Sequence, residues 1–156
     1  MARLYLVEIG GTREDCLFEL HSVHAIVAQD DGELLAQCRE KFTGLYGAPH
    51  IDGWISFDLT PPEPGARLPG MGFFVVELGR NSAEHLRETH HYLFLEAPNG
   101  REALQSARAQ MPGWHIDTVL DLDRLAQRMG HALDRRNAKG QPQPAFTSRY
   151  IRLDRM

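Results

Sequence analysis

An internal repeat constrains the fold of this chain more than any other feature of its sequence. A shift of 69 positions places LYLVEIGG, residues 4–11, over FFVVELGR, residues 73–80, and the match continues without a gap to residue 44. About eleven of some forty aligned positions are identical. A gap of four residues then aligns HID at residues 50–52 with HID at residues 115–117. The elements are therefore predicted for both copies together.

Each copy contains the same order of predicted elements. RLYLVEI and GFFVVEL are short runs of β-branched and aromatic residues, which predicts strands that end at Gly10 and Gly79 and then turn. FELHSVHAIVA, residues 18–28, and its counterpart THHYLFLEA predict second strands that form hairpins with the first. DDGELLAQCREKFTG and PNGREALQSARAQMPG have capping residues and apolar residues at helical spacing, which predicts helices. A third strand then begins at each HID.

The predicted architecture is an α+β fold of two strand-strand-helix-strand modules related by pseudo-twofold symmetry. Behind the second module, DLDRLAQRMGHALDRRNAKG has apolar residues at helical spacing and predicts a C-terminal helix, and AFTSRYIRLD predicts an extra strand. Four prolines and two glycines in TPPEPGARLPG predict a linker between the modules. The organisation is one compact domain with a first module at 1–59, a linker at 60–70, a second module at 71–123 and a basic C-terminal extension at 124–156.

Composition places the chain among ordinary globular proteins. It has 156 residues, 42% hydrophobic residues and a formal net charge of −4. No apolar stretch is long enough to cross a membrane, and the first residues lack the pattern of a signal peptide, so we expect a cytoplasmic protein. Cys16 and Cys38 fit neither a CxxC motif nor a disulfide framework, which favours free thiols. The negative net charge argues against a nucleic-acid partner.

The candidate functional residues are acids and histidines spaced two apart. Such residues share one face of an extended strand. If the two strands of a module are neighbours, two imidazoles and two carboxylates converge. The candidate ligand-binding residues are Glu19, His21, His50 and Asp52 in the first copy and Glu88, His90, His115 and Asp117 in the second.

Three chemical interpretations of these residues stay open. Imidazole nitrogens and carboxylate oxygens suit a divalent transition metal such as Zn, Fe, Mn or Ni, with His21 and His50 as its ligands. The same groups could form a proton relay, because histidine titrates near neutral pH and a carboxylate fixes its tautomer. In the third interpretation, the pairs are structural and fix the register of the strands.

YLVEIGG, FELHSVHAIVA and HIDGW, in this order, resemble the uncharacterised DUF1543 family. The resemblance covers residues 4–58 well and residues 73–123 more loosely. It implies one or two copies of this module per chain and marks the same positions, but the family brings no activity. The first copy has Ser22 where the family pattern carries Asp, and the second has Val119 in place of the aromatic residue Trp54.

Two functions follow from these observations, and neither names a reaction. The first is a small ligand-binding or metal-binding protein with acid–histidine pairs in each module; whether it is an enzyme is left open. The alternative is a non-catalytic interaction or scaffold module, in which the pairs are structural and the basic tail binds a protein partner. The fused modules are expected to mimic a dimer, and further oligomerisation is left open.

Overall fold

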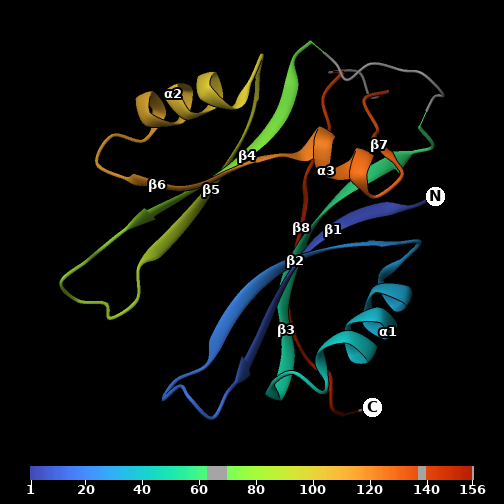
Figure 1. Cartoon of the computed structure of the whole chain (residues 1–156), viewed down its shortest axis with the longest axis vertical. Coiled ribbons are helices and arrows are strands. Elements are labelled where there is room, and N and C mark those ends of the chain that lie inside the picture. The colour runs from blue at the N-terminus through green and yellow to red at the C-terminus, as the bar shows by residue number, and fades with distance from the viewer. Residues whose placement is uncertain (63–69, 137–139, 156) are drawn as a thin grey trace. The chain divides into compact units, whose positions relative to one another are not determined.

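The computed structural model of the chain describes residues 1–62, 70–136 and 140–155, and it is an α+β fold, as predicted (Figure 1). The predicted linker at 60–70 lies for the most part outside the described residues. The elements in chain order are β1 (Arg3–Thr12), β2 (Leu20–Ala28), α1 (Asp31–Phe42), β3 (Gly47–Thr60), β4 (Gly72–Arg80), β5 (Thr89–Ala97), α2 (Gly100–Gln110), β6 (His115–Asp121), α3 (Leu122–Arg128), β7 (Ala132–Leu133) and β8 (Ala145–Arg152).

The chain divides into two compact units, and each contains the predicted order of strand, strand, helix and strand. The first unit comprises Met1–Thr60 together with Leu133–Met156, and the second comprises Pro61–Ala132. The predicted extension at 124–156 spans the boundary between the two units. Its first part belongs to the second unit, and its last part returns to the first. The predicted pseudo-twofold symmetry between the modules stays a prediction.

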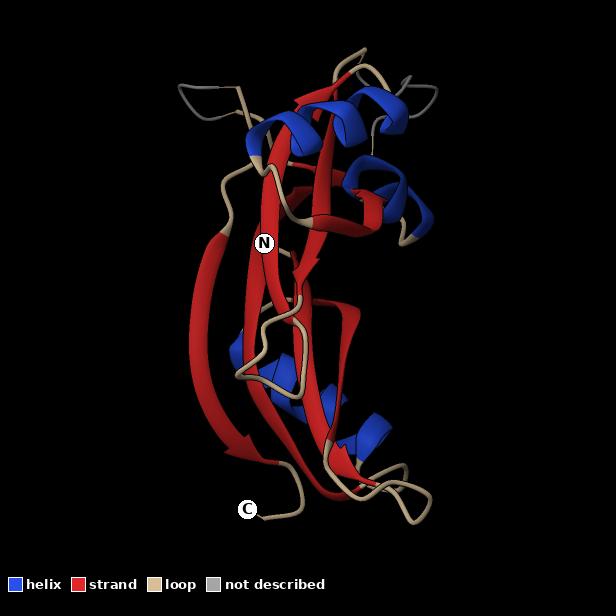
Figure 2. Ribbon diagram, turned by 90° about the vertical axis from the view of Figure 1, so that its left-hand side faces the viewer, coloured by secondary structure: helices blue, strands red, loops and turns tan. Residues whose placement is uncertain are grey.

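The sheet of the first unit is built around β1, which pairs antiparallel with β2 on one side and β3 on the other. Strand β3 pairs in turn with β7 and β8, and Figure 2 shows β8 as the strand that leads to the C-terminus. Alternate residues of β1 point to opposite faces of the sheet, so Tyr5, Val7 and Ile9 form one face. They pack into a core with Leu34 and Cys38 of α1. The opposite face of β1 carries Glu8 and Gly10.

The second unit repeats this arrangement with three strands in the order β5-β4-β6. Phe74, Val76 and Leu78 of β4 pack into a core with Ala103 and Ala107 of α2. The small side chains on α2 allow the helix to lie close to the sheet. The face of β4 away from α2 carries Glu77 and Gly79.

The helices α1 and α2 begin at equivalent caps. The Asp30 carboxylate accepts a hydrogen bond from the backbone N–H of Glu33 at 2.8 Å, and the Asn99 side chain accepts one from Glu102 at 2.9 Å. The Glu33 carboxylate also accepts the N–H of Gln29, the residue before the cap. Each cap fixes where its helix begins after the second strand.

The predicted C-terminal helix is wrong in length. Helix α3 ends at Arg128, because the chain reverses at Gly130, which has a φ of 80° that other residues rarely adopt. The N–H groups of Gly130 and His131 bond to the carbonyls of Gln127 and Ala126 and close the helix end. The predicted extra strand is present as β8, and it pairs with β3 of the first unit.

Several arginines of the basic tail are paired with acids of the same segment. Arg136 lies 2.9 Å from Asp134, and Arg152 lies 2.7 Å from Asp154. The hydrogen bonds from Arg136 lower the pKa of the Asp134 carboxyl to about 2. These pairs reduce the positive charge that the tail offers to a partner.

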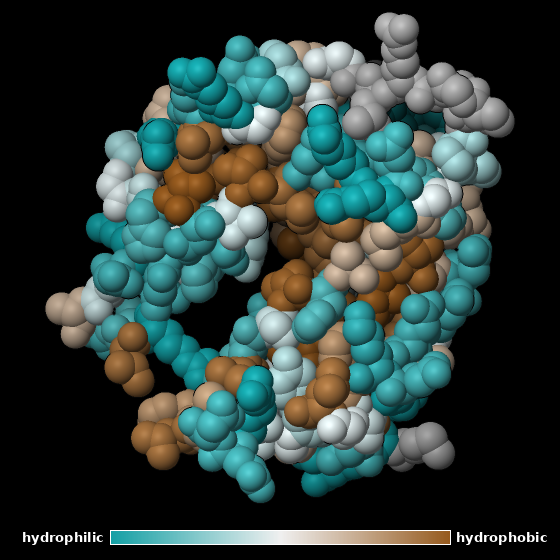
Figure 3. All heavy atoms as spheres, in the orientation of Figure 1, coloured by the Kyte–Doolittle hydropathy of each residue, from teal (hydrophilic) through white to brown (hydrophobic). Residues whose placement is uncertain are grey.

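The surface carries both hydrophilic and hydrophobic side chains on the face drawn in Figure 3. Exposed hydrophobic residues include Leu17 and Phe18 in the β1–β2 loop and Leu86 in the β4–β5 loop. Among the described residues, no helix has the length and apolarity needed to span a membrane.

The two thiols differ in burial, which predicts a difference in reactivity. Cys38 is fully buried against the sheet, and burial raises the pKa of its thiol to about 11. Cys16 is partly exposed. We expect a thiol reagent near neutral pH to label Cys16 in the native protein and Cys38 only after unfolding. Equal labelling rates of the two thiols in the native protein would contradict this packing.

Candidate functional site

The candidate site of the first unit is organised around Gly10, which lies inside β1 rather than in a turn after it. Gly10 is the register partner of His21 on β2 and of His50 on β3. Two strands that flank a third lie roughly 10 Å apart, yet the rings of His21 and His50 have centroids only 6.3 Å apart. The rings approach each other because Gly10 has no side chain between them. A Cβ at Gly10 would overlap Nε2 of His50 and lie 3.1 Å from Cε1 of His21.

A β-bulge directs Asp52 to this face of the sheet. Glu8 pairs with Gly53 and Ile9 pairs with Ile51, so Asp52 is an extra residue without a register partner on β1. Because of the bulge, the residues on both sides of Asp52 can keep their apolar side chains in the core: Ile51 and Trp54 both pack there although they are three apart. Asp52 is left on the face opposite α1.

The two imidazoles and two carboxylates predicted from the sequence form a closed ring of contacts. Asp52 lies 2.8 Å from Nδ1 of His21 through one oxygen and 3.3 Å from Nε2 of His50 through the other. Glu19, just before β2, approaches the remaining nitrogen of His21 at 3.3 Å and the same Nε2 of His50 at 3.5 Å. Each carboxylate therefore bridges the two rings.

His50 is held in one tautomer by the backbone. Its side chain is 2% exposed, and its Nδ1 lies 3.0 Å from the carbonyl oxygen of Ala48. A carbonyl only accepts, so Nδ1 carries a proton, and in the neutral ring the lone pair of Nε2 points toward Glu19 and Asp52. Ala48 has a φ of 48°, a left-handed conformation that is costly for a residue other than glycine. This conformation places its carbonyl oxygen next to His50.

Glu8 is a member of the site that the sequence analysis missed. Its carboxylate lies 3.4 Å from Nδ1 of His21, on the same face of β1 as Gly10. Burial raises the pKa of the Glu8 carboxyl above its ordinary value, and the nearby Asp52 carboxylate raises it further, whereas His21 lowers it. The signal was present in the sequence, since an acid stands two residues before the strand glycine in both copies.

The second unit repeats this site around Gly79. Gly79 is the register partner of His90 and His115, and a Cβ at this position would overlap the carboxylate of Glu88. Asp117 is again the extra residue of a bulge. Its two oxygens lie 3.3 Å from Nε2 of His90 and 3.2 Å from Nε2 of His115. Glu88 also contacts both of these nitrogens.

Glu77 occupies in the second unit the position that Glu8 has in the first. Its carboxylate accepts hydrogen bonds from Tyr92 at 3.0 Å and from Thr118 at 3.4 Å. The hydroxyl groups hold the Glu77 carboxylate on the same face of the sheet as His90. Both copies thus contribute a third carboxylate.

The two sites differ in how far they are covered. The side chain of His50 is 2% exposed, whereas that of His115 is 48% exposed. Tyr150 of β8 accounts for part of the difference, because its ring centroid lies 4.5 Å from that of His50. In the described part of the second unit, β6 pairs with β4 alone.

Each group of described side chains that could surround one ion contains a single imidazole. Three such groups occur among the described residues, each with ligand atoms within 4.8 Å of one another. They are Glu8, His21 and Asp52 in the first unit, and Glu77, His90 and Asp117 together with Glu88, His115 and Asp117 in the second. Asp117 belongs to both groups of the second unit.

The other histidines on these strands point away from the sites. His24 of β2 faces α1, where its ring lies 4.6 Å from that of Phe42, and it contacts the Ser22 hydroxyl. Burial lowers the pKa of His24. His91 of β5 lies beside Trp114. The E-x-H spacing thus separates the site histidines from those that pack on the opposite face.

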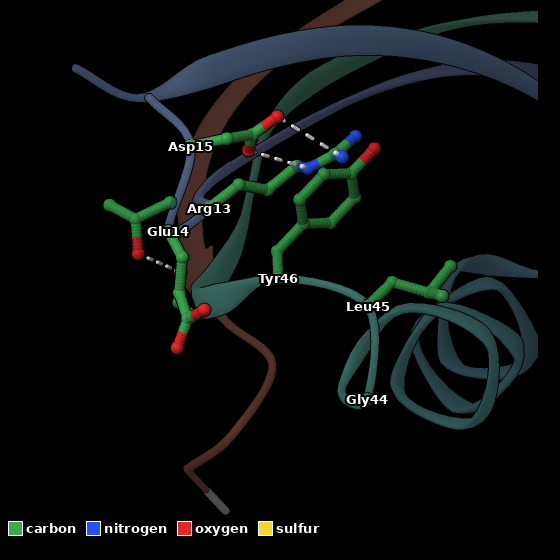
Figure 4. Close-up of a pocket in the computed structure, with 8 residues that line it drawn as sticks. Arg13, Glu14, Asp15, Gly44, Leu45 and Tyr46 are labelled. Carbon is green, nitrogen blue, oxygen red and sulfur yellow. Dashed lines mark hydrogen bonds and ion pairs between the residues drawn. The ribbon is translucent and has the colours of Figure 1, made fainter. Parts of the chain in front are cut away.

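A hollow of about 560 Å³ lies at the loop end of β1, beyond Gly10 (Figure 4). Arg13 is turned toward Asp15, whose carboxylate lies 3.3 Å from its guanidinium. Tyr46 and Leu45 complete the wall. Asp15 balances the charge of Arg13. The residues that line the hollow do not form a group of imidazoles and carboxylates like the one around Gly10.

Comparisons with known proteins support the fold alone. No family model matches the sequence, and no curated protein matches it. The crystal structure of a protein designated Il1583, from Idiomarina loihiensis, is similar over 98% of this chain and 98% of its own. The TM-score is 0.58 and the sequence identity 20%. The likeness therefore extends over the full α+β architecture of both units.

Substitution of Gly10 tests the close approach of the rings. We expect Gly10→Ala to lower the free energy of unfolding by about 1–3 kcal/mol, because the buried His50 ring must move. The NMR signals of His21 and His50 should shift as well. Gly44→Ala is the control, since a Cβ there meets nothing within 4 Å, and its effect should stay below about 0.5 kcal/mol. Equal effects of the two substitutions would show that Gly10 does not limit the rings.

The contact with Ala48 predicts the tautomer of His50. In the neutral ring the proton should reside on Nδ1, which long-range ¹H–¹⁵N correlation spectra report directly. A proton on Nε2 in the neutral ring would mean that the bond to the Ala48 carbonyl is absent.

Proposed function

We propose that this chain is a metal-binding protein, which binds a divalent transition metal through the acid–histidine cluster of each unit. The cluster of the first unit is defined as Glu8, Glu19, His21, His50 and Asp52, and that of the second as Glu77, Glu88, His90, His115 and Asp117. Nitrogen and carboxylate oxygen ligands in this combination fit Mn²⁺, Fe²⁺ and Zn²⁺. The resemblance to the DUF1543 family stays a prediction and adds no activity.

The ligand groups around His21, His90 and His115 carry this proposal, and the environment of His50 supports it. Histidines that bind metals usually donate the proton of their second nitrogen to a carbonyl or carboxylate, which directs the other lone pair at the metal. His50 donates from Nδ1 to Ala48 and directs Nε2 toward two carboxylates. A lone pair facing carboxylate oxygens is repelled by them unless a cation or a proton lies between them.

The charge of the cluster supports a cation as well. Three carboxylates lie around two imidazoles, and Glu8 is half-buried. Burial raises the pKa of the Glu8 carboxyl, and the neighbouring Asp52 carboxylate raises it further, so the charged form of Glu8 is disfavoured here. A divalent cation would stabilise all three carboxylates together.

Metal binding is tested by elemental analysis and calorimetric titration of protein purified without a histidine tag. We expect Mn²⁺ or Zn²⁺ to bind, and at roughly 100 times the dissociation constant to stabilise the fold by about 2.7 kcal/mol. His21→Ala should weaken binding in the first unit by at least tenfold. His85→Ala is the matched control, because His85 lies exposed in a loop outside both clusters, and it should bind as the wild type does.

The scaffold function predicts a different outcome. If the pairs serve only the register of the strands, His21→Ala lowers the melting temperature while neither protein binds Mn²⁺ or Zn²⁺. This result would reject metal binding and favour the structural interpretation.

A further inference from the structure

We propose that the cluster of the second unit holds two metal ions bridged by Asp117, rather than one ion shared by the two histidines. This inference rests on the proposed metal binding and specifies how many ions each unit takes. The first unit takes one ion, because its described residues form one ligand group, Glu8, His21 and Asp52.

The grouping of ligand atoms separates the two histidines. Ligands of one ion lie about 2.0–2.2 Å from it, so two of them are separated by no more than about 4.4 Å. In the second unit, His90 belongs to a group with Glu77, and His115 to a group with Glu88, and no group of the described residues contains both imidazoles. Asp117 is the member common to the two groups.

The aspartate is placed to bridge. One oxygen of Asp117 faces His90 and the other faces His115, at 3.3 and 3.2 Å. Asp52 also directs one oxygen at His21 and the other at His50, but no ligand group of the described residues contains His50. A carboxylate can bridge two ions when each of its oxygens faces a different set of ligands. The ions of two-metal sites lie roughly 3.5–4 Å apart.

The second glutamate supports the same arrangement. Glu88 contacts Nε2 of both His90 and His115, so it lies beside Asp117 between the two ligand groups. Glu77 then remains as a terminal ligand on the His90 side. Two imidazole nitrogens and six carboxylate oxygens exceed what a single ion of about six ligands can use.

Charge agrees with two ions. The three carboxylates of this cluster carry −3, so one divalent ion leaves −1 and two leave +1. A bridging hydroxide would neutralise that charge, and hydroxide between two metals is a nucleophile at neutral pH. Two ions with a hydroxide therefore give a neutral centre, whereas a single ion leaves an uncompensated carboxylate.

The number of bound Mn²⁺ ions tests this proposal. Equilibrium dialysis at saturating Mn²⁺ should give three ions per wild-type chain and one for the double variant His90→Ala/His115→Ala. Both histidines are well exposed, so their loss should spare the fold. The control His85→Ala should retain three. A result of two ions in the wild type and one in the double variant overturns the paired centre and leaves metal binding intact, whereas no bound ion overturns both.

Electron paramagnetic resonance of the Mn²⁺-loaded wild type provides a second test that needs no variant. Ions within roughly 4 Å of each other are magnetically coupled, so their spectrum broadens and departs from that of isolated Mn²⁺. A spectrum of isolated ions alone at full loading would overturn the proposal.

Discussion

The absence of a side chain at Gly10 is the constraint on which the site depends. Two strands that flank a central strand are too far apart for their imidazoles to share a carboxylate. With no Cβ on the central strand, the rings of His21 and His50 approach to 6.3 Å between centroids. The bulge at Asp52 then supplies a carboxylate to both rings. In the second unit, Gly79 leaves the same space and Asp117 supplies the same bulged carboxylate.

The sequence predicted the fold class and the order of strand, strand, helix and strand, because the apolar runs, caps and glycines repeat in both halves. It also selected the acids and histidines that the structure brings together. It placed Gly10 in a turn, since a glycine after a strand usually marks one, whereas here the glycine makes room for the rings of His21 and His50. The sequence also contains a sign of the bulge. Ile51 and Trp54 are three residues apart, and a regular strand cannot bury two such residues on one face.

The tail was harder to predict, for a different physical reason. The helical spacing of apolar residues continues past residue 128, but Gly130 adopts a positive φ that ends α3. The return of β8 to β3 pairs residues that are 89 to 102 positions apart, from Ser56 with Ala145 to His50 with Arg152, and local patterns do not encode such a pairing. As a result, the cover that Tyr150 forms over His50 could not be predicted from the repeat.

The bulge also determines how such a site can be lost during evolution. Asp52 is the extra residue of β3, and Ile51 and Trp54 on either side of it both reach the core. Deletion of Asp52 would leave Ile51 and Trp54 two apart, as in a regular strand, so both side chains could stay on the core face. Replacement of Asp52 by another residue would remove the carboxylate and keep the bulge. A lineage can therefore abandon the site either by substitution or by loss of the one extra residue, and in both cases the core against α1 keeps its side chains.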